Sequence, residues 1–227
     1  MLPLIRLGSV DSTQAFLGRH PELGFCGVMA DLQAAGRGRG ENRWEAASGT
    51  GLCLSAALPV PDLNPGLVPQ RAMLAVIEAL EPCGVALGLK WPNDLVAWKE
   101  GRLVKVGGIL GEHKGNRILL GLGVNLTAAP ELGDRPIPPA SLAELGARVM
   151  DREGLARVIL EHWEDLTVTR VPSFRWPETG DTVAWEAGQG TVEDWLEDGR
   201  LRVRTAEGVL DLTGGDLRGL SPRSMPS

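Results

Sequence analysis

Apolar residues recur at helical spacing near the end of the first third of the chain. Residues 70–81 read QRAMLAVIEALE and place Met73, Val76, Ile77 and Leu80 at i, i+3, i+4 and i+7, between flanking prolines. This spacing puts the four side chains on one face of a helix, and the prolines mark its ends. The pattern predicts an amphipathic helix over 70–81.

Capping signals predict three further helices. The side chain of Asp11 or Ser12 can accept hydrogen bonds from the first free amides of a short helix that begins there. Ser141 and Glu144 have the spacing of a capping box, and apolar stripes follow them. We therefore expect two consecutive helices, over 141–150 and 153–168.

Short apolar runs between these helices have the length of strands and are separated by Gly, Pro or Asn. They cover residues 26–30, 52–58, 85–91, 103–112 and 117–126. Helices and strands do not alternate with the regular spacing of a parallel sheet. The expected fold class is α+β, with a mixed, mainly antiparallel sheet and helices on one side of it.

The pattern changes after about residue 172. Four strand-like pieces, DTVAWEA, GTVEDWL, RLRVRT and GVLDLT, follow one another at short intervals with glycine-containing turns between them. No helical stripe occurs among them. We expect a first domain over 1–172 and a small all-β barrel over 173–227.

Composition places the chain among globular proteins. It has 227 residues, 43% of them hydrophobic, and a net charge of -6. Acidity argues against broad nucleic-acid binding, and no run is long enough for a membrane helix or patterned as a signal peptide. We expect a cytoplasmic protein without a DNA or membrane partner. Cys26, Cys53 and Cys83 stand far apart in apolar surroundings, which is typical of reduced core thiols.

The acidic chain nonetheless carries a local cluster of arginines. Residues 34–44 read AAGRGRGENRW, in which Arg37, Arg39 and Arg43 stand against one glutamate. Glycines let the backbone fold tightly, guanidinium groups bind anionic oxygens, and Trp44 offers an aromatic face. Binding of an anion is one interpretation, and a solvated basic loop is the alternative.

Two lysine-containing segments follow apolar runs. In KWPND, residues 90–94, Asn93 and Asp94 can bind ribose hydroxyls or a magnesium ion, although Pro-Asn-Asp is also ordinary turn chemistry. In LVKVGGILGE, residues 103–112, Lys105 is one of only four lysines and precedes a glycine pair. Its ammonium group is expected in a half-apolar site near the backbone; a lysine at a sheet edge that reaches solvent is the alternative.

A third segment, GLGVNL at residues 121–126, interrupts an apolar strand with Gly121 and Gly123 before Asn125. Glycines within a strand indicate the close approach of a ligand or of another backbone segment. Asn125 can form hydrogen bonds through its amide. The helix that a dinucleotide-binding fingerprint requires does not follow.

Together and in this order, five segments resemble the catalytic core of the biotin protein ligases (biotin-[acetyl-CoA-carboxylase] ligases). They are STQ at 12–14, QAAGRGR at 33–39, KWPND at 90–94, KVGGIL at 105–110 and GLGVN at 121–125. The resemblance covers roughly residues 8–170 and implies a class II synthetase-like core. The trailing β-module is similar to the SH3-like C-terminal domain of that family.

The resemblance implies a reaction in two steps that requires ATP and magnesium. Biotin and ATP form biotinoyl-5'-AMP and pyrophosphate, and a lysine of a biotin carboxyl carrier domain, as in acetyl-CoA carboxylase, then displaces AMP. Two anions must meet in the first step. Cations fixed at their junction would stabilise the charge-rich transition state more than the ground state.

The resemblance also implies roles for individual residues. Lys105, Arg37 and Arg39 would act at the reacting groups, with Lys105 bridging the biotin carboxylate and the α-phosphate. Biotin would be bound by Ser12, Thr13, Gln33, Gly36, Arg37, Lys105 and Gly108. ATP would be bound by Arg39, Trp44, Asn93, Asp94 and Asn125, with Asp94 as the candidate magnesium ligand.

The chain departs from the family pattern in the basic loop. The third arginine is displaced by one position, so Arg43 either replaces it at the phosphate or faces solvent. Gly51 stands where many members have asparagine. About ten residues precede the STQ segment. We therefore expect a monomeric or homodimeric ligase without the DNA-binding domain and repressor activity of some members.

Two alternative functions compete with biotin ligation. Lipoate ligation and octanoyl transfer use a related fold, but octanoyl transfer needs an activated cysteine, and no histidine or lysine pattern adjoins the three cysteines. The basic loop and the barrel could instead form a nucleic-acid or peptide-binding module whose affinity depends steeply on salt. KWPND together with KVGGIL favours biotin, and the acidic net charge disfavours nucleic acid.

Overall fold

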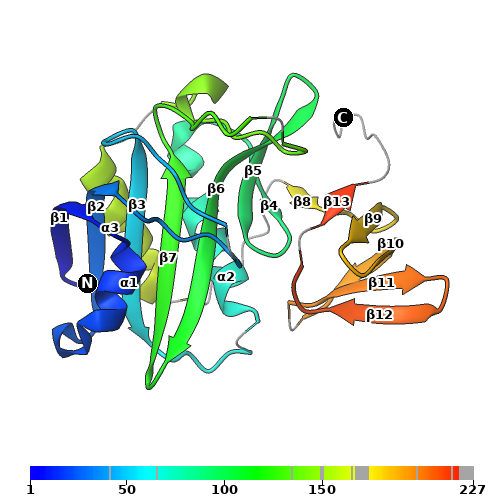
Figure 1. Cartoon of the computed structure of the whole chain (residues 1–227), viewed down its shortest axis with the longest axis horizontal. Coiled ribbons are helices and arrows are strands. Elements are labelled where there is room, and N and C mark those ends of the chain that lie inside the picture. Colours follow the sequence, from blue (N-terminus) through cyan, green and yellow to red (C-terminus); the bar gives the residue numbers. More distant parts are fainter. Residues whose placement is uncertain are drawn as a thin grey trace.

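The computed structural model describes residues 1–40, 42–64, 66–133, 135–148, 151–164, 166, 174–197, 199–215 and 217–219. Within these residues the chain forms two β-sheets and three α-helices (Figure 1). The helices are α1 (Thr13–Arg19), α2 (Val68–Ala79) and α3 (Arg152–Glu164), with short 3-10 turns at Pro21–Leu23, Glu81–Cys83 and Ala143–Leu145.

The first sheet is mixed and mainly antiparallel. Its strands are β1 (Leu4–Val10), β2 (Cys26–Gln33), β3 (Gly51–Pro59), β4 (Leu87–Lys90), β5 (Asp94–Lys99), β6 (Arg102–Lys114), β7 (Arg117–Asn125) and β8 (Phe174–Trp176). They lie in the order β1-β2-β3-β7-β6-β5-β4-β8. The β1–β2 and β4–β8 pairs are parallel and the other pairs are antiparallel, which confirms the predicted fold class.

The two faces of this sheet carry different helices. Leu54 and Leu122 point to the main core, which α2 and α3 complete. On the other face, Leu17 of α1 packs with Val28 and Leu119. Successive side chains of a strand point to opposite faces of the sheet. The same strands therefore supply apolar residues to both cores. The one-sided arrangement that we predicted therefore holds for the two longer helices, whereas α1 lies on the opposite face.

Local signals placed two of the helices correctly. The hydroxyl of Ser12 accepts a hydrogen bond from the amide of Ala15 at 3.3 Å and caps α1. Helix α2 begins two residues earlier than predicted, and Met73, Val76 and Leu80 are fully buried in the main core. The apolar stripe therefore faces the sheet, as its spacing requires.

The helix predicted over 141–150 is wrong for the described part of that range. Ser141 and Glu144 do form the capping box, with the Ser141 amide donating to Oε2 of Glu144 at 2.6 Å. Only a 3-10 turn follows, because Gly146 turns the chain in a left-handed conformation with φ +76°. Residues 149–150 lie outside the described residues, as do 165 and 167–168 of the last predicted helix.

Three strands of the first sheet were not predicted. They are β1, β5 and β8. Strand β5 begins at Asp94, so the last residue of KWPND is already paired to β4 and β6. The start of this strand was not predicted because residues 92–94, Pro-Asn-Asp, are equally typical of a loop.

The second sheet is antiparallel and compatible with an SH3-like domain. Its strands β9 (Thr182–Trp185), β10 (Gly188–Trp195), β11 (Leu201–Thr205), β12 (Gly208–Leu212) and β13 (Arg218–Gly219) lie in the order β12-β11-β10-β9-β13. The preceding strand β8 pairs with β4 of the first sheet. The domain boundary between 172 and 173 stays a prediction. No helix in the described part of the chain is long and apolar enough to cross a membrane.

Candidate functional site

A cavity of about 380 Å³ lies on the face of the first sheet that carries α1. Its floor comes from β3 to β7, and its walls come from α1, the loop after β2, the proline-rich segment 130–139 and the second sheet. Polar and charged side chains from all these elements converge on it. Of the residues assigned to ligands from the sequence, all except Gly36 line this cavity.

A hydrogen-bond network at one end of the cavity fixes an amide group. Oε1 of Gln33 accepts from the backbone amide and the hydroxyl of Thr13, at 2.7 and 3.0 Å. The Thr13 hydroxyl lies 2.8 Å from the Ser55 hydroxyl. Since the Thr13 proton goes to Gln33, Ser55 must be the donor of that bond. The network holds the carbonyl side of the Gln33 amide in a fixed orientation.

An ion pair stands in the middle of the site. Nζ of Lys105 on β6 lies 2.6 Å from Oδ1 of Asp94, and Nζ of the buried Lys90 lies 3.6 Å from Oδ2 of the same carboxylate. A Cβ on Gly108 would be 3.3 Å from Oδ1 of Asp94 and 3.6 Å from Nζ of Lys105. Absence of a side chain at Gly108 therefore lets the ion pair lie against the backbone. The Lys105 side chain is 37% exposed, and its half-apolar site stays a prediction.

Three residues that line the cavity have a buried polar atom without a protein partner among the described residues. These atoms are Oδ1 of Asn125, Nη1 of Arg39 and Nε1 of Trp44. The Asn125 amide donates to the carbonyl of Ala140 at 3.2 Å, so its orientation is fixed. A buried polar atom without a partner costs free energy. An acceptor on Asn125 and a donor on Arg39 are thus available to a polar ligand in this cavity.

The arginine-containing loop closes on itself over the sheet. The Trp44 amide donates to the Gly36 carbonyl at 3.0 Å, and the Gly38 amide donates to the Asn42 carbonyl at 2.8 Å. A Cβ on Gly36 would lie 2.3 Å from the Trp44 carbonyl oxygen. Gly36 is thus required by the close approach of the loop strands, and its assignment to biotin stays a prediction.

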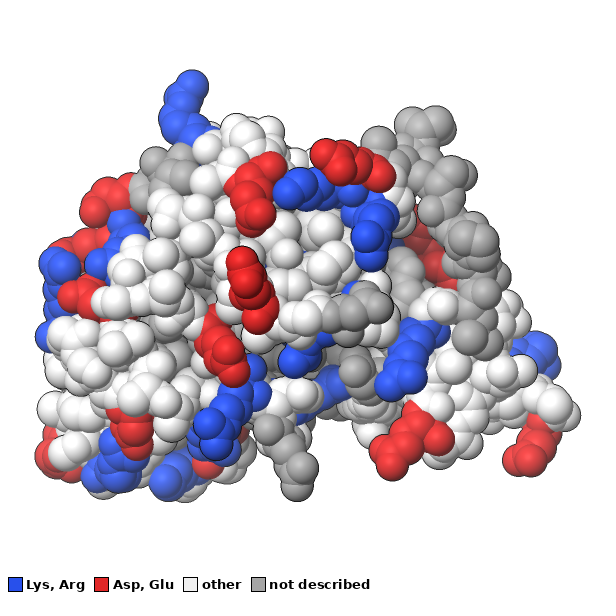
Figure 2. Space-filling model, turned by 45° about the horizontal axis from the view of Figure 1, so that its top comes forward, with Lys and Arg blue, Asp and Glu red and all other residues white. Residues whose placement is uncertain are grey.

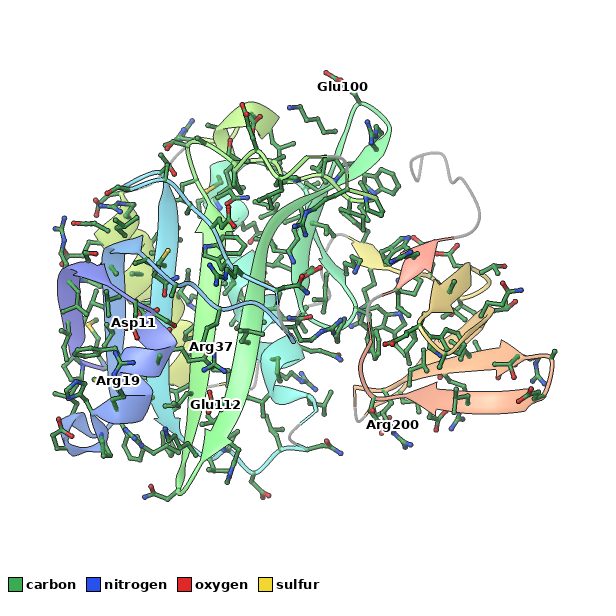
Figure 3. All side chains as sticks on the ribbon, viewed as in Figure 1. Asp11, Arg19, Arg37, Glu100, Glu112 and Arg200 are labelled. Carbon is green, nitrogen blue, oxygen red and sulfur yellow. The ribbon has the colours of Figure 1, made fainter. Side chains whose placement is uncertain are left out.

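The three arginines of the loop have different surroundings. Nη1 of Arg37 lies 3.4 Å from Oε2 of Glu112 on β6, and Figure 3 shows the two side chains over the sheet. Nη2 of Arg39 donates to the carbonyl of Gly215 in the C-terminal segment at 2.5 Å. Arg43 forms an isolated β-bridge with Arg37 and lines the cavity. All three residues therefore line the same cavity, Arg43 from an exposed position.

Basic residues also approach the cavity from elements that the sequence did not connect with it. Arg135 and Arg218 line it, the latter from the second sheet. Figure 2 shows basic side chains around the hollow between the parts that carry the two sheets. In a chain of net charge -6, this local concentration of cations favours an anionic ligand.

Sequence reasoning missed several other residues of the cavity wall, including Gln14, Ser55 and Leu217. Ser55 had a detectable signal, because it is the one hydroxyl residue in the apolar strand GLCLSAALP. Leu217 and Arg218 had none, since only the fold brings them beside residues more than a hundred positions away. The histidines and cysteines of the described chain form no metal cluster with acidic residues.

Comparison with protein families matches residues 18–127 to the Biotin/lipoate A/B protein ligase family. A biotin--[acetyl-CoA-carboxylase] ligase of Mycobacterium tuberculosis is 37% identical over 145 residues, which are 60% of this chain and 52% of that protein. The bifunctional ligase/repressor BirA of Bacillus subtilis is 32% identical over 147 residues, 59% of this chain and 43% of that protein. The chain thus spans about half the length of the curated relatives that it matches.

Solved structures match over nearly the whole chain. A variant of the biotin protein ligase from Aquifex aeolicus in complex with biotin is 26% identical, with a TM-score of 0.76 over 95% of this chain and 98% of that one. The Aquifex aeolicus biotin protein ligase in complex with biotin and ATP is 25% identical, with a TM-score of 0.72 over 98% of this chain and 99% of that one. Both sheets therefore have counterparts in these proteins.

Proposed function

Since the chain contains a biotin protein ligase core, we propose that it activates biotin with ATP and transfers it to a lysine of a biotin carboxyl carrier domain. In the first step a biotin carboxylate oxygen attacks the α-phosphorus of ATP, and the bond to the β-phosphate breaks. Biotinoyl-5'-AMP and pyrophosphate result. In the second step the amine of the acceptor lysine attacks the biotinoyl carbonyl carbon, and AMP leaves.

The observation that carries this proposal is that one cavity has an uncharged polar end and a cationic end. Thr13, Gln33 and Ser55 present fixed amide and hydroxyl groups, which suit the ureido group of biotin. Lys105, Arg37 and Arg39 present cations, which suit a carboxylate and a phosphate. A ligand that is polar but uncharged at one end and anionic at the other satisfies both.

Lys105 is the group that we place at the reacting atoms. Its ammonium already lies against a carboxylate, Asp94, at 2.6 Å. When two anions enter the cavity, Lys105 can turn to their junction, while Lys90 at 3.6 Å keeps a positive charge beside Asp94. A fixed cation at this junction offsets the repulsion between carboxylate and phosphate as the new bond forms.

Nucleotide would lie near Arg39, Trp44, Asn93, Asp94 and Asn125. The unpaired Oδ1 of Asn125 can accept from a ribose hydroxyl or an amino group, and the unpaired Nη1 of Arg39 can donate to a phosphate. Asp94 is the carboxylate that would hold a magnesium ion accompanying ATP. Magnesium prefers oxygen ligands and binds chiefly through phosphates in such sites. When bound, it would neutralise charge on the leaving pyrophosphate.

Pyrophosphate release tests the first half-reaction. Purified protein with ATP, magnesium and biotin should release pyrophosphate, whereas lipoate in place of biotin should not, and chelation of magnesium should abolish the release. Lys105→Ala should lower the rate about 10²- to 10³-fold, as loss of a preorganised transition-state donor does. Lys99→Ala is the matched control, because Lys99 pairs with Glu144 at 3.8 Å outside the cavity.

The outcomes separate the competing functions. Release with lipoate but not biotin would assign the chain to lipoate ligation. No release with either acid, from protein with a cooperative unfolding transition, would contradict the ligase proposal and favour a binding module. Transfer to a biotin carboxyl carrier domain, detected by mass spectrometry, tests the second half-reaction. A cytoplasmic location and a monomeric or homodimeric state stay predictions of the sequence.

A further inference from the structure

Trp91 is the second residue of the KWPND segment, and its side chain lies in the core of the second sheet. It stands in the turn between β4 and β5, next to the cavity residues Pro92, Asn93 and Asp94. Its side chain is fully buried at 0% exposure. It belongs to a buried apolar cluster whose other buried members come from the second sheet and its C-terminal segment: Val183, Val192, Leu201, Val203, Leu212 and Leu217. Trp176 of β8 also packs against this cluster.

Hydrogen bonds hold both ends of Trp91. Its indole Nε1 donates to the carbonyl of Gly199, in the turn between β10 and β11, at 3.0 Å. Its backbone amide donates to the carbonyl of Trp176 on β8 at 2.8 Å. The same Gly199 carbonyl accepts from Nε2 of Gln70 on α2 at 2.7 Å. The Gly199 carbonyl therefore holds both α2 and the turn that contains Trp91.

The residues after Trp91 are fixed from the opposite side by β6. The side-chain amide of Asn93 donates to the carbonyl of Ile109 at 2.6 Å, and the Ile109 amide donates to the carbonyl of Asn93 at 3.0 Å. Lys105 of the same strand pairs with Asp94. The 91–94 turn is thus held between the second sheet and β6, and its position depends on both.

We propose that the second sheet positions the nucleotide half of the site and that Trp91 is the positioning residue through which it acts. The inference rests on the proposed function for what the positioned residues bind. Leu217 supports it, because this side chain belongs to the same core as Trp91 and also lines the cavity. The Thr13, Gln33 and Ser55 network is built from α1, β2 and β3, away from this junction. Loosening Trp91 should therefore affect ATP and not biotin.

The test compares two tryptophans of one core. Trp91→Phe shortens the side chain and removes its bond to Gly199. Trp195→Phe is the matched control: Trp195 packs on the same core, and its Nε1 donates to the carbonyl of Pro177 at 2.8 Å, but it does not line or adjoin the cavity. We expect Trp91→Phe to raise the KM for ATP about 10- to 100-fold, the range that follows from small misplacement of binding groups. The Kd for biotin should change less than about threefold in both variants.

Hydrogen exchange gives a readout that needs no substrate. The Ile109 amide, bonded to the Asn93 carbonyl, should exchange at least about tenfold faster in Trp91→Phe and at the wild-type rate in Trp195→Phe. If Trp91→Phe does not yield folded protein, Val203→Ala loosens the same core from β11 and leaves the turn sequence intact, with the same expectations.

Unchanged exchange at Ile109 together with an unchanged KM for ATP would overturn the proposal, and so would a parallel loss of biotin and ATP affinity. Equal effects in Trp195→Phe would likewise overturn it, because they would reflect general loosening of the module. Wild-type protein that releases no pyrophosphate with biotin would instead contradict the proposed function. In that case the exchange rates alone decide whether Trp91 positions the turn.

Discussion

The indole ring of Trp44 occupies the space that a side chain on Gly123 would fill. A Cβ built on Gly123 would lie 2.2 Å from Cε2 of Trp44, far inside contact distance. Trp44 comes from the basic loop and Gly123 from the middle of the sheet. From the sequence, Gly123 indicated the close approach of a ligand or of another backbone segment. In the structure it makes room for the Trp44 ring, which lines the cavity.

Gly123→Ala should displace Trp44 and weaken nucleotide binding. The methyl group cannot coexist with the ring in its present position, so either the loop moves or β7 shifts. If Trp44 lies beside the nucleotide, we expect the KM for ATP to rise about tenfold, which corresponds to about 1.4 kcal/mol. Steady-state pyrophosphate release measures this. Gly8→Ala on β1, with nothing within 4 Å of its Cβ position, is the control and should leave KM unchanged.

Thr13→Val should destabilise the protein and weaken biotin binding together. Valine keeps the shape of threonine but leaves the fully buried Ser55 hydroxyl without its acceptor, and an unsatisfied buried hydroxyl costs about 1–3 kcal/mol. Chemical denaturation measures this loss, and calorimetric titration measures the biotin Kd.

Adding Ser55→Ala to Thr13→Val should recover part of the lost stability, because both partners of the bond are then absent. Biotin binding should stay weak in the double variant, since Gln33 remains without its hydroxyl donor. Thr191→Val, at an exposed position of β10, serves as the control. A double variant less stable than Thr13→Val alone would contradict the assigned network.

The stability of the protein in acid should depend on the bidentate ion pair between Asp11 and Arg19 at the start of α1. Figure 3 shows these two side chains facing each other. Nη1 and Nη2 of Arg19 each donate to one oxygen of the Asp11 carboxylate at 2.7 Å. These bonds, with that from the Ser12 backbone, lower the pKa of Asp11 from 3.8 to about 2. Because the folded-state pKa is depressed, the stabilisation is present above about pH 3.8 and is lost as pH falls through about 2.

Carboxyl resonances in NMR should therefore give a midpoint of about 2 for Asp11 in the wild type and a value nearer 3.8 in Arg19→Gln. The free energies of unfolding of these two proteins should converge as the pH falls from 4 toward 2. Arg157→Gln, which removes a guanidinium paired with Glu153, should leave the Asp11 midpoint in place. An Asp11 midpoint that does not respond to Arg19 would contradict the pair.

The three cysteines should resist alkylation in the folded protein. Cys26, Cys53 and Cys83 are buried and unpaired, and burial raises the pKa of each thiol. Raised pKa values leave little of the reactive thiolate at neutral pH. Iodoacetamide at pH 7.5 should give unlabelled native protein with full activity, and three adducts after unfolding in urea. Rapid labelling of one native cysteine with loss of activity would favour the cysteine-dependent octanoyl transfer route.

The sequence by itself determined the features that depend on neighbours along the chain. The apolar stripe of α2, the Ser12 cap of α1 and the capping box of Ser141 and Glu144 are all present. These rest on spacings of three or four residues, which one turn of backbone converts into contacts. The five ordered motifs also supplied many of the residues that line the cavity.

Tertiary structure decided what those local signals lead to. The capping box is followed directly by a 3-10 turn, because Gly146 turns the chain in a left-handed conformation with φ +76°. The Leu142 and Ala143 amides bond to the carbonyls of Asn125 and Leu126 at the end of β7 and hold this turn against the sheet. Trp91 read as the end of a strand but completes the core of the second sheet. Leu217 reaches the cavity although it lies 112 positions from Lys105 in the sequence. Burial of apolar surface between distant segments selects these contacts, and spacing along a single chain carries no record of them.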